Sequence, residues 1–114
     1  MTKLSQLETS VRLSIINPKA ESNSVFGRGI ANLCIGVREK GSLNAAAKSM
    51  GMAYSKAWRI IKDPEQALGI ELLIRDGAHG SELSEAGNQL VDSYLAIQEK
   101  ISEEALKLYK KLNK

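Results

Sequence analysis

The sequence is 114 residues long, with 43% hydrophobic residues, 25% charged residues and a formal net charge of +3, as expected for one small soluble domain. No apolar run reaches the roughly 18–20 residues that a membrane-spanning helix needs, and residues 1–10 lack the hydrophobic region of a signal peptide, so we expect a cytoplasmic protein without membrane contact. The single cysteine, Cys34, excludes an internal disulfide, and the single histidine, His79, leaves too few ligands for a zinc site; we therefore expect no metal and no cofactor.

Residues 11–16 alternate in polarity. Val11, Leu13 and Ile15 would lie on one face, with polar side chains opposite. A period of two predicts a strand, which ends at the Asn17-Pro18 pair.

A first helix is predicted after Phe26. Apolar residues then recur with helical spacing, at Ile30, Leu33, Cys34 and Val37. Gly41 would end the helix as its C′ residue. The place of Cys34 on this stripe favours a small buried hydrophobic side chain over a redox switch.

Residues 42–68 have the pattern of a helix-turn-helix. Ser42 is a good N-cap for an alanine-rich helix over residues 43–50, and Gly51 suits the left-handed conformation of a tight corner. A third helix is predicted from about residue 53 to residue 68. Because Pro64 would remove a hydrogen bond inside it, we expect a kink or a split at Asp63-Pro64.

The charge within this pattern is one-sided. Residues 42–62 contain no acidic residue and four basic ones, Lys48, Lys56, Arg59 and Lys62. A helix pair with positive charge on its second member is typical of a protein that inserts a helix into the major groove of DNA.

A β-hairpin is predicted next, with strands at residues 71–75 and 81–83 joined by a turn that contains two glycines. This hairpin would be the wing of a winged helix, and the strand of residues 11–16 is a candidate third strand of its sheet.

The last helix opens at Ser84 and carries an unusually long apolar stripe, formed by Leu90, Tyr94, Ile97, Ile101, Ala105, Leu108 and Leu112. From residue 90 to residue 112 this helix spans roughly 33 Å. Packing against the first helix would cover only its first two turns, so we expect a second copy of the chain to cover the rest, with an interface at Leu90, Tyr94, Ile97, Ile101 and Leu108.

The fold class that these elements predict is mainly α with a small β-sheet. We expect a winged helix-turn-helix with an N-terminal strand, a β-hairpin wing and a long C-terminal dimerisation helix. Residues 1–83 would form the DNA-binding domain, and residues 84–114 the dimerisation helix within the same domain.

The segment EKGSLNAAAKSMGMAYSKAWRIIKDPEQALGIELLIR, followed by LSEAGNQLVDSY, resembles the N-terminal winged helix of ModE-type molybdate-responsive regulators. It is similar, more distantly, to the DNA-binding domain of LysR-type regulators. The resemblance implies a dimer that binds operator DNA. Because the chain ends at Lys114, it also implies a regulator that lacks the molybdate-binding domain, with a separate sensor protein as a possible partner. The predicted wing is short for the ModE type, which leaves its contact with DNA open.

In this geometry the start of the third helix presents side chains to base edges, and we expect Tyr54, Ser55, Lys56 and Arg59 to do so. Arg59 is the strongest candidate because its planar fork can bind guanine O6 and N7 together; a solvated or phosphate-bound side chain is the alternative. Phosphate contacts, which do not read sequence, are expected from Lys62, again Lys56, Asn44, Ser42 and Arg75. Ser42 could equally serve as a cap alone.

Two further residues are tempting as DNA contacts. Trp58, the only tryptophan, is more simply explained by packing against the second helix or the wing. His79 is more simply an exposed turn residue.

The leading functional hypothesis is a sequence-specific transcriptional regulator that binds double-stranded DNA as a homodimer. The alternative is a winged-helix adaptor that docks proteins and oligomerises through its last helix, but an adaptor would not need to exclude acidic residues from residues 42–62. We expect no enzyme, because neither a carboxylate pair nor a Cys/His arrangement is present.

Overall fold

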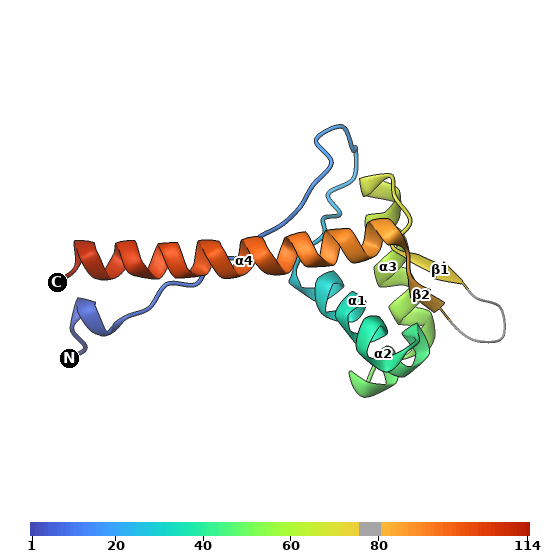
Figure 1. The fold of residues 1–114 in the computed structure, drawn as a ribbon, viewed down its shortest axis with the longest axis horizontal. Helices are drawn as coiled ribbons and strands as arrows, with labels where there is room; N and C mark the ends of the chain where they lie inside the picture. The colour runs from blue at the N-terminus through green and yellow to red at the C-terminus, as the bar shows by residue number, and fades with distance from the viewer. Residues whose placement is uncertain (76–80) are drawn as a thin grey trace.

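The computed structural model describes residues 1–75 and 81–114 (Figure 1). In chain order its elements are η1 (Leu4–Gln6), α1 (Arg28–Lys40), α2 (Leu43–Ser49), α3 (Tyr54–Leu68), β1 (Leu73–Arg75), β2 (Ser81–Leu83) and α4 (Glu85–Leu112). The predicted class, a mainly helical winged helix-turn-helix with a long last helix, is confirmed. Within these two ranges, none of the helices is both long and apolar enough to cross a membrane.

The first three helices pack around one apolar core. Ser42 caps α2 as predicted, its Oγ accepting a hydrogen bond from the Ala45 N–H at 3.0 Å. A Cβ atom at Gly36 of α1 would lie 3.0 Å from the Cβ of Ala46, so the small residues of α2 let the two helices approach closely. Gly51 makes the corner between α2 and α3 with a φ of 66°.

Helix α3 runs unbroken from Tyr54 to Leu68, so the predicted split at Asp63-Pro64 is wrong. A proline at this position cannot donate to the carbonyl of Ile60. The helix continues because the face that holds Pro64 is buried along its length, together with Ala57, Ile61 and Ala67. Burial of this face offsets the missing hydrogen bond.

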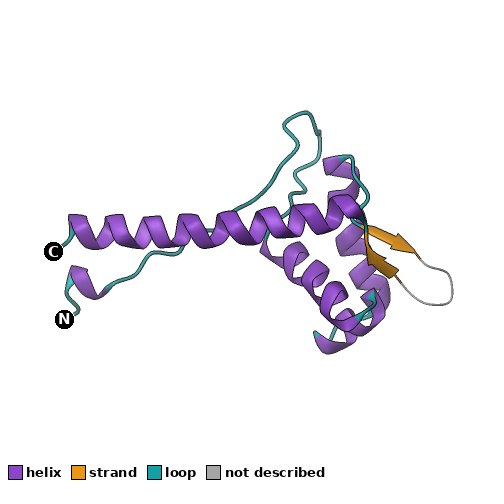
Figure 2. Cartoon of the chain, in the orientation of Figure 1, coloured by secondary structure: helices purple, strands orange, loops and turns teal. Residues whose placement is uncertain are grey.

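The wing is a two-stranded antiparallel hairpin in which Leu73 pairs with Leu83 and Arg75 pairs with Ser81 (Figure 2). It is tied to α3 by the Glu65 carboxylate, whose Oε2 accepts a hydrogen bond from the Leu72 N–H at 2.7 Å. The predicted turn, with His79, lies outside the described residues.

The strand predicted over residues 11–16 does not form, and the described sheet has two strands. The segment makes one isolated antiparallel bridge, between Ile15 and Phe26. Further upstream its backbone is paired by a side chain instead: Gln98 of α4 accepts from the Leu13 N–H at 2.8 Å and donates to the Val11 carbonyl at 2.6 Å. An amide side chain therefore takes the place that a neighbouring strand would have filled.

Helix α4 packs on the core with its first half and extends beyond it with its second (Figure 1). The N-terminal segment, residues 3–13, runs beside the outer half, where the Tyr109 hydroxyl donates to the Leu4 carbonyl at 2.8 Å and Lys110 Nζ donates to the Leu7 carbonyl at 3.1 Å. The two chain ends therefore lie together at the far end of the molecule. The chain thus supplies a partial cover for the outer half that the sequence did not predict.

One residue of the predicted dimer interface is misplaced. Tyr94 is only 5% exposed, and its ring meets that of Phe26 edge-to-face, with 5.7 Å between centroids. Leu90 is partly buried against the same core. Tyr94 therefore belongs to the core of its own chain, because the core reaches one helical turn further along α4 than the sequence pattern indicated.

Candidate nucleic-acid interface

The side of α3 opposite its buried face is open to solvent. Every residue predicted there is exposed, and these are Tyr54, Ser55, Lys56, Arg59 and Lys62. Among the ion pairs formed by the described residues, none involves a basic residue of this set. Their positive charge is therefore available to a ligand, as a phosphate backbone requires.

Two of the predicted phosphate contacts, Ser42 and Asn44, lie at the start of α2, the helix that precedes α3. The Ser42 hydroxyl accepts the capping hydrogen bond, which supports the capping role, while its own O–H can still donate to a phosphate. Asn44 is exposed in the first turn.

Ser81 positions α2, a role that the sequence pattern did not reveal. Ser81 at the start of β2 is 4% exposed, and its Oγ accepts from the Leu43 N–H at 3.1 Å. This bond satisfies a free N–H at the helix start and docks α2 on the wing. A serine at the start of a short strand carries no sequence signal that could have revealed this contact.

Trp58 packs against the wing, one of the two packing sites that the sequence favoured over a DNA contact. The guanidinium carbon of Arg75 lies 4.2 Å from the centroid of the Trp58 ring, and Tyr54 meets the same ring edge-to-face with 6.2 Å between centroids. The Trp58 indole nitrogen is buried and has no hydrogen-bond partner among the described residues. The three side chains form a cluster that joins the first turns of α3 to the end of β1.

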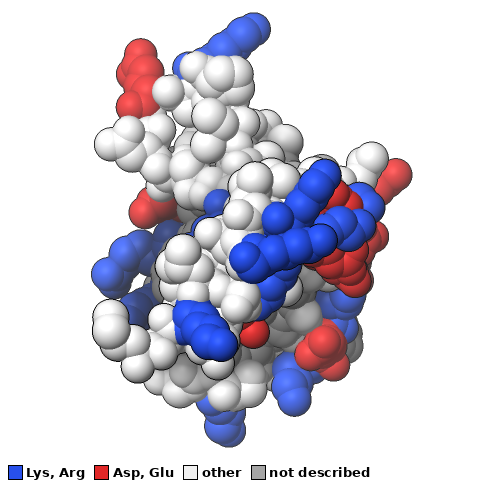
Figure 3. Space-filling view, turned by 90° about the vertical axis from the view of Figure 1, so that its left-hand side faces the viewer, with Lys and Arg blue, Asp and Glu red and all other residues white. Residues whose placement is uncertain are grey.

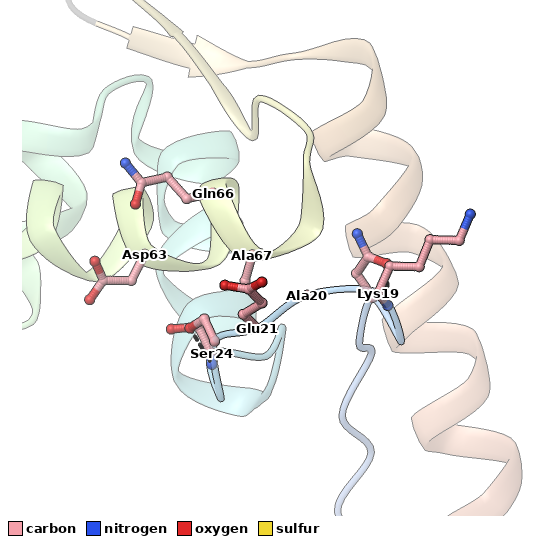
Figure 4. Close-up of a pocket in the computed structure, with 9 residues that line it drawn as sticks. Lys19, Ala20, Glu21, Ser24, Asp63, Gln66 and Ala67 are labelled. Carbon is pink, nitrogen blue, oxygen red and sulfur yellow. Dashed lines mark hydrogen bonds between the residues drawn. The ribbon is translucent and has the colours of Figure 1, made fainter.

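A polar hollow of about 620 Å³ lies at the other end of α3 (Figure 4). Asp63 and Gln66 of α3 line it, together with Lys19 and Glu21 of the loop before α1. Two carboxylates and only one lysine at its rim make it a poor site for a phosphate. Neither here nor elsewhere in the described ranges is a group of three or more potential metal ligands found.

Cys34 is buried in the core, and this burial raises the pKa of its thiol from 9.0 to about 12, with a smaller contribution from the nearby Glu65 carboxylate. A thiol with this pKa stays protonated at neutral pH and is a poor nucleophile. These values support the buried hydrophobic role over the redox switch.

The face at the two chain ends is different in charge. Basic and acidic side chains lie side by side there (Figure 3). A surface of mixed sign has no preference for a polyanion. Of these two surfaces, the exposed side of α3 is therefore the candidate for binding nucleic acid.

Comparison with known proteins points the same way. Residues 32–88, which run from α1 through the wing into α4, match the family described as bacterial regulatory helix-turn-helix protein, lysR family. The chain is also similar to a solved structure, the DNA-binding domain of CbnR in complex with DNA, at 30% identity and a TM-score of 0.55; the match covers 65% of this chain and 84% of that one. No curated protein matches the sequence. The LysR-type resemblance is thereby confirmed, and the ModE-type resemblance stays a prediction.

Proposed function

The chain belongs to the lysR family of bacterial regulatory helix-turn-helix proteins, a family of DNA-binding transcription regulators, and we propose that it reads a specific sequence in double-stranded DNA as a homodimer. The observation that carries the first part is the exposed side of α3, which is basic, free of acidic residues in its first half and unpaired within the described chain. Such a helix fits the major groove of DNA.

Two kinds of contact are expected from this face. Arg59 reads a base, because its guanidinium can donate two parallel hydrogen bonds to guanine, which is worth about 1–3 kcal/mol of discrimination. Tyr54 and Ser55 lie about one turn earlier on α3 and contact the neighbouring base edges. The remaining proposed residues bind phosphates and set the register on the duplex; these are Lys56, Lys62, Arg75, Ser42 and Asn44.

Selection of bound DNA from a random duplex pool at two salt concentrations tests this division. Arg59→Ala should weaken binding to the preferred site and relax the preference at one base position. Lys62→Ala should weaken binding to all sequences and lower the slope of log K against log salt by about one unit. Lys100→Ala, on the exposed surface of α4, is the matched control and should change neither.

Equal losses on all sequences for Arg59→Ala would contradict its base-reading role. A protein that ignores duplex DNA even in dilute salt would overturn the proposal and favour the adaptor.

The homodimer is supported by the outer half of α4. Several apolar side chains there are exposed, including Ile97 at 44%, Leu108 at 56% and Leu112 at 72%. Charge supplies a direction for the pairing: residues 85–104 hold five acidic residues and one lysine, whereas residues 105–114 hold four lysines and no acidic residue. Two copies of α4 packed antiparallel would place opposite charges together.

Sedimentation of variants tests the dimer. Ile97→Asp and Ile101→Asp each place a charge in the proposed seam and should convert the dimer to a monomer. Leu95→Asp is the matched control, because Leu95 is 42% exposed but lies roughly 200° around the helix from Ile97. If neither isoleucine variant changes the mass, α4 is not the interface.

A further inference from the structure

The Trp58–Arg75 contact joins the two parts of the molecule that face DNA in the proposed function. Trp58 belongs to α3, and Arg75 is the last residue of β1, where the wing leaves the body of the domain. The guanidinium carbon lies 4.2 Å from the ring centroid, which is well within the range of a cation–π interaction. The side chain of Arg75, on the wing, therefore packs against a side chain of α3.

This contact leaves the arginine able to bind. A guanidinium that stacks on a ring uses its flat face, whereas its five N–H donors point outward in its plane. Arg75 is exposed, and it forms none of the ion pairs seen among the described residues. The nearby Glu65 carboxylate is already engaged, because its Oε2 accepts from the backbone N–H groups of Leu72 and Leu73. The donors of Arg75 thus keep their capacity for an anion.

A second cation lies close to the contact. Lys62, one turn beyond Trp58 on α3, borders the same shallow hollow of about 410 Å³ as Trp58 and Arg75, and the carboxylates of Glu65 and Glu71 line it as well. Tyr54, one turn before Trp58, meets the Trp58 ring edge-to-face and is 47% exposed. Trp58 is thus packed against Tyr54 on α3, with the Arg75 guanidinium over its ring and Lys62 bordering the same hollow.

We infer that Trp58 is a positioning residue: it holds the guanidinium of Arg75 against α3, so that the helix and the wing meet the DNA as one surface and Arg75 binds a backbone phosphate beside the groove that α3 enters. The inference rests on the proposed function, because it needs duplex DNA as the ligand. An arginine already held in its bound position loses less conformational freedom on binding than a free one.

A double-mutant cycle on DNA affinity tests the coupling. Arg75→Ala should weaken binding to all sequences about tenfold and lower the salt slope by about one unit. Trp58→Ala should lower affinity several-fold although it removes no charge, and the Arg75→Ala/Trp58→Ala double variant should bind no worse than Arg75→Ala alone. Trp58→Phe should restore most of the loss, because a phenyl ring also attracts a cation. Arg28→Ala, at the exposed start of α1, is the control and should keep full affinity.

Fluorescence of the free protein supplies a readout that needs neither DNA nor a tryptophan variant. Trp58 is the only tryptophan, so its emission reports on this site alone. Removing the guanidinium in Arg75→Ala should expose one face of the ring, shift the emission to longer wavelength and raise quenching by acrylamide. Arg28→Ala should leave both unchanged.

The outcomes separate this inference from the function on which it rests. If the unaltered protein binds no duplex DNA, both fall. If it binds DNA but the losses from Arg75→Ala and Trp58→Ala multiply in the double variant, or Arg75→Ala leaves the quenching unchanged, only the positioning role is overturned.

Discussion

The two halves of α4 form one unbroken helix, but only the first half packs against the core. In the first half, Gly87, Val91 and Tyr94 are buried, and Arg38 of α1 adds an ion pair to Asp92 at 3.0 Å. In the second half, residues 95–112, none of the described side chains is buried. The helical hydrogen bonds are the same in both, so the difference lies in what covers the side chains.

The side of α4 that packs on the core stays covered beyond the point where the core ends. Its helical spacing continues from Tyr94 to Gln98, Ser102 and Tyr109, and here the N-terminal segment takes the place of the core. The exposed apolar stripe lies beside this face rather than on it. The outer half therefore has one side covered by its own chain and a second side free for another molecule.

The largest expected difference between core and outer half is in thiol chemistry. In a Glu103→Cys variant that keeps Cys34, the new thiol stands on the exposed outer half and the old one in the core. Because burial raises the pKa of Cys34 from 9.0 to about 12, its thiolate fraction at pH 8 is about 1,000-fold lower than that of an ordinary thiol. Labelling with a thiol reagent, followed by peptide mass analysis, should show Cys34 reacting slower than the new thiol by about two to three orders of magnitude.

Comparable labelling rates in the folded protein would show that the core is open at Cys34. The raised pKa of Cys34 also makes the stability of the protein depend on pH. The folded state keeps the thiol proton up to about pH 12, whereas the unfolded chain loses it near 9.0, so the free energy of unfolding should fall as the pH rises above about 9.

The next largest effect is expected from a methyl group added at Gly87. A Cβ there would overlap the backbone carbonyl of Leu72, which cannot move aside because it accepts from the Ser84 N–H at 2.9 Å. Gly87→Ala should lower the free energy of unfolding by about 3 kcal/mol in urea titrations. Gly29→Ala adds the same methyl group to α1 where nothing lies within 4 Å, and it should be neutral or slightly stabilising.

Side-chain truncation compares the two halves directly. Val91→Ala in the first half removes fully buried apolar atoms and should cost about 2 kcal/mol in the free energy of unfolding. Leu95→Ala at the start of the outer half removes atoms that are already 42% exposed, and it should cost less than about 0.5 kcal/mol. Similar costs for the two would mean that the outer half is covered in solution by more than its own N-terminal segment.

The last effect is local rather than global, and it is expected at the link between the N-terminal segment and α4. Gln98→Ala removes the hydrogen bonds to the Leu13 N–H and the Val11 carbonyl, worth about 1 kcal/mol each. Hydrogen exchange should show the Leu13 amide exchanging faster, while the amides of α1 keep their rates. Gln89→Ala, at an exposed site in the first half, is the control. Unchanged exchange at Leu13 would mean that this link is not formed in solution.

Local patterns predicted the helix-turn-helix and the wing because their signals are local. A serine that can cap a helix, a glycine at a corner and a helical repeat of apolar residues each act within a few positions, as Ser42 and Gly51 show. The exposed face of α3 followed from the same repeat. The contact of Trp58 with the wing could be favoured from its place on α3, but its partner, Arg75, could not be identified.

What the sequence did not reveal depends on residues far apart in the chain. The alternation of residues 11–16 does describe an extended segment, with Val11, Leu13 and Ile15 less exposed than their neighbours. Its partner is a glutamine side chain 85 positions away from Leu13, and no local pattern identifies such a partner. Tyr94 was misassigned for a related reason, because the spacing of apolar residues along α4 is the same on both sides of the point where the core ends.

The position of the two chain ends has a practical consequence. Both lie at the tip of the outer half of α4, whose residues 95–112 measure about 27 Å along the helix axis. A dye, an affinity tag or a surface linker joined to either end is therefore held well away from α3 of the same chain.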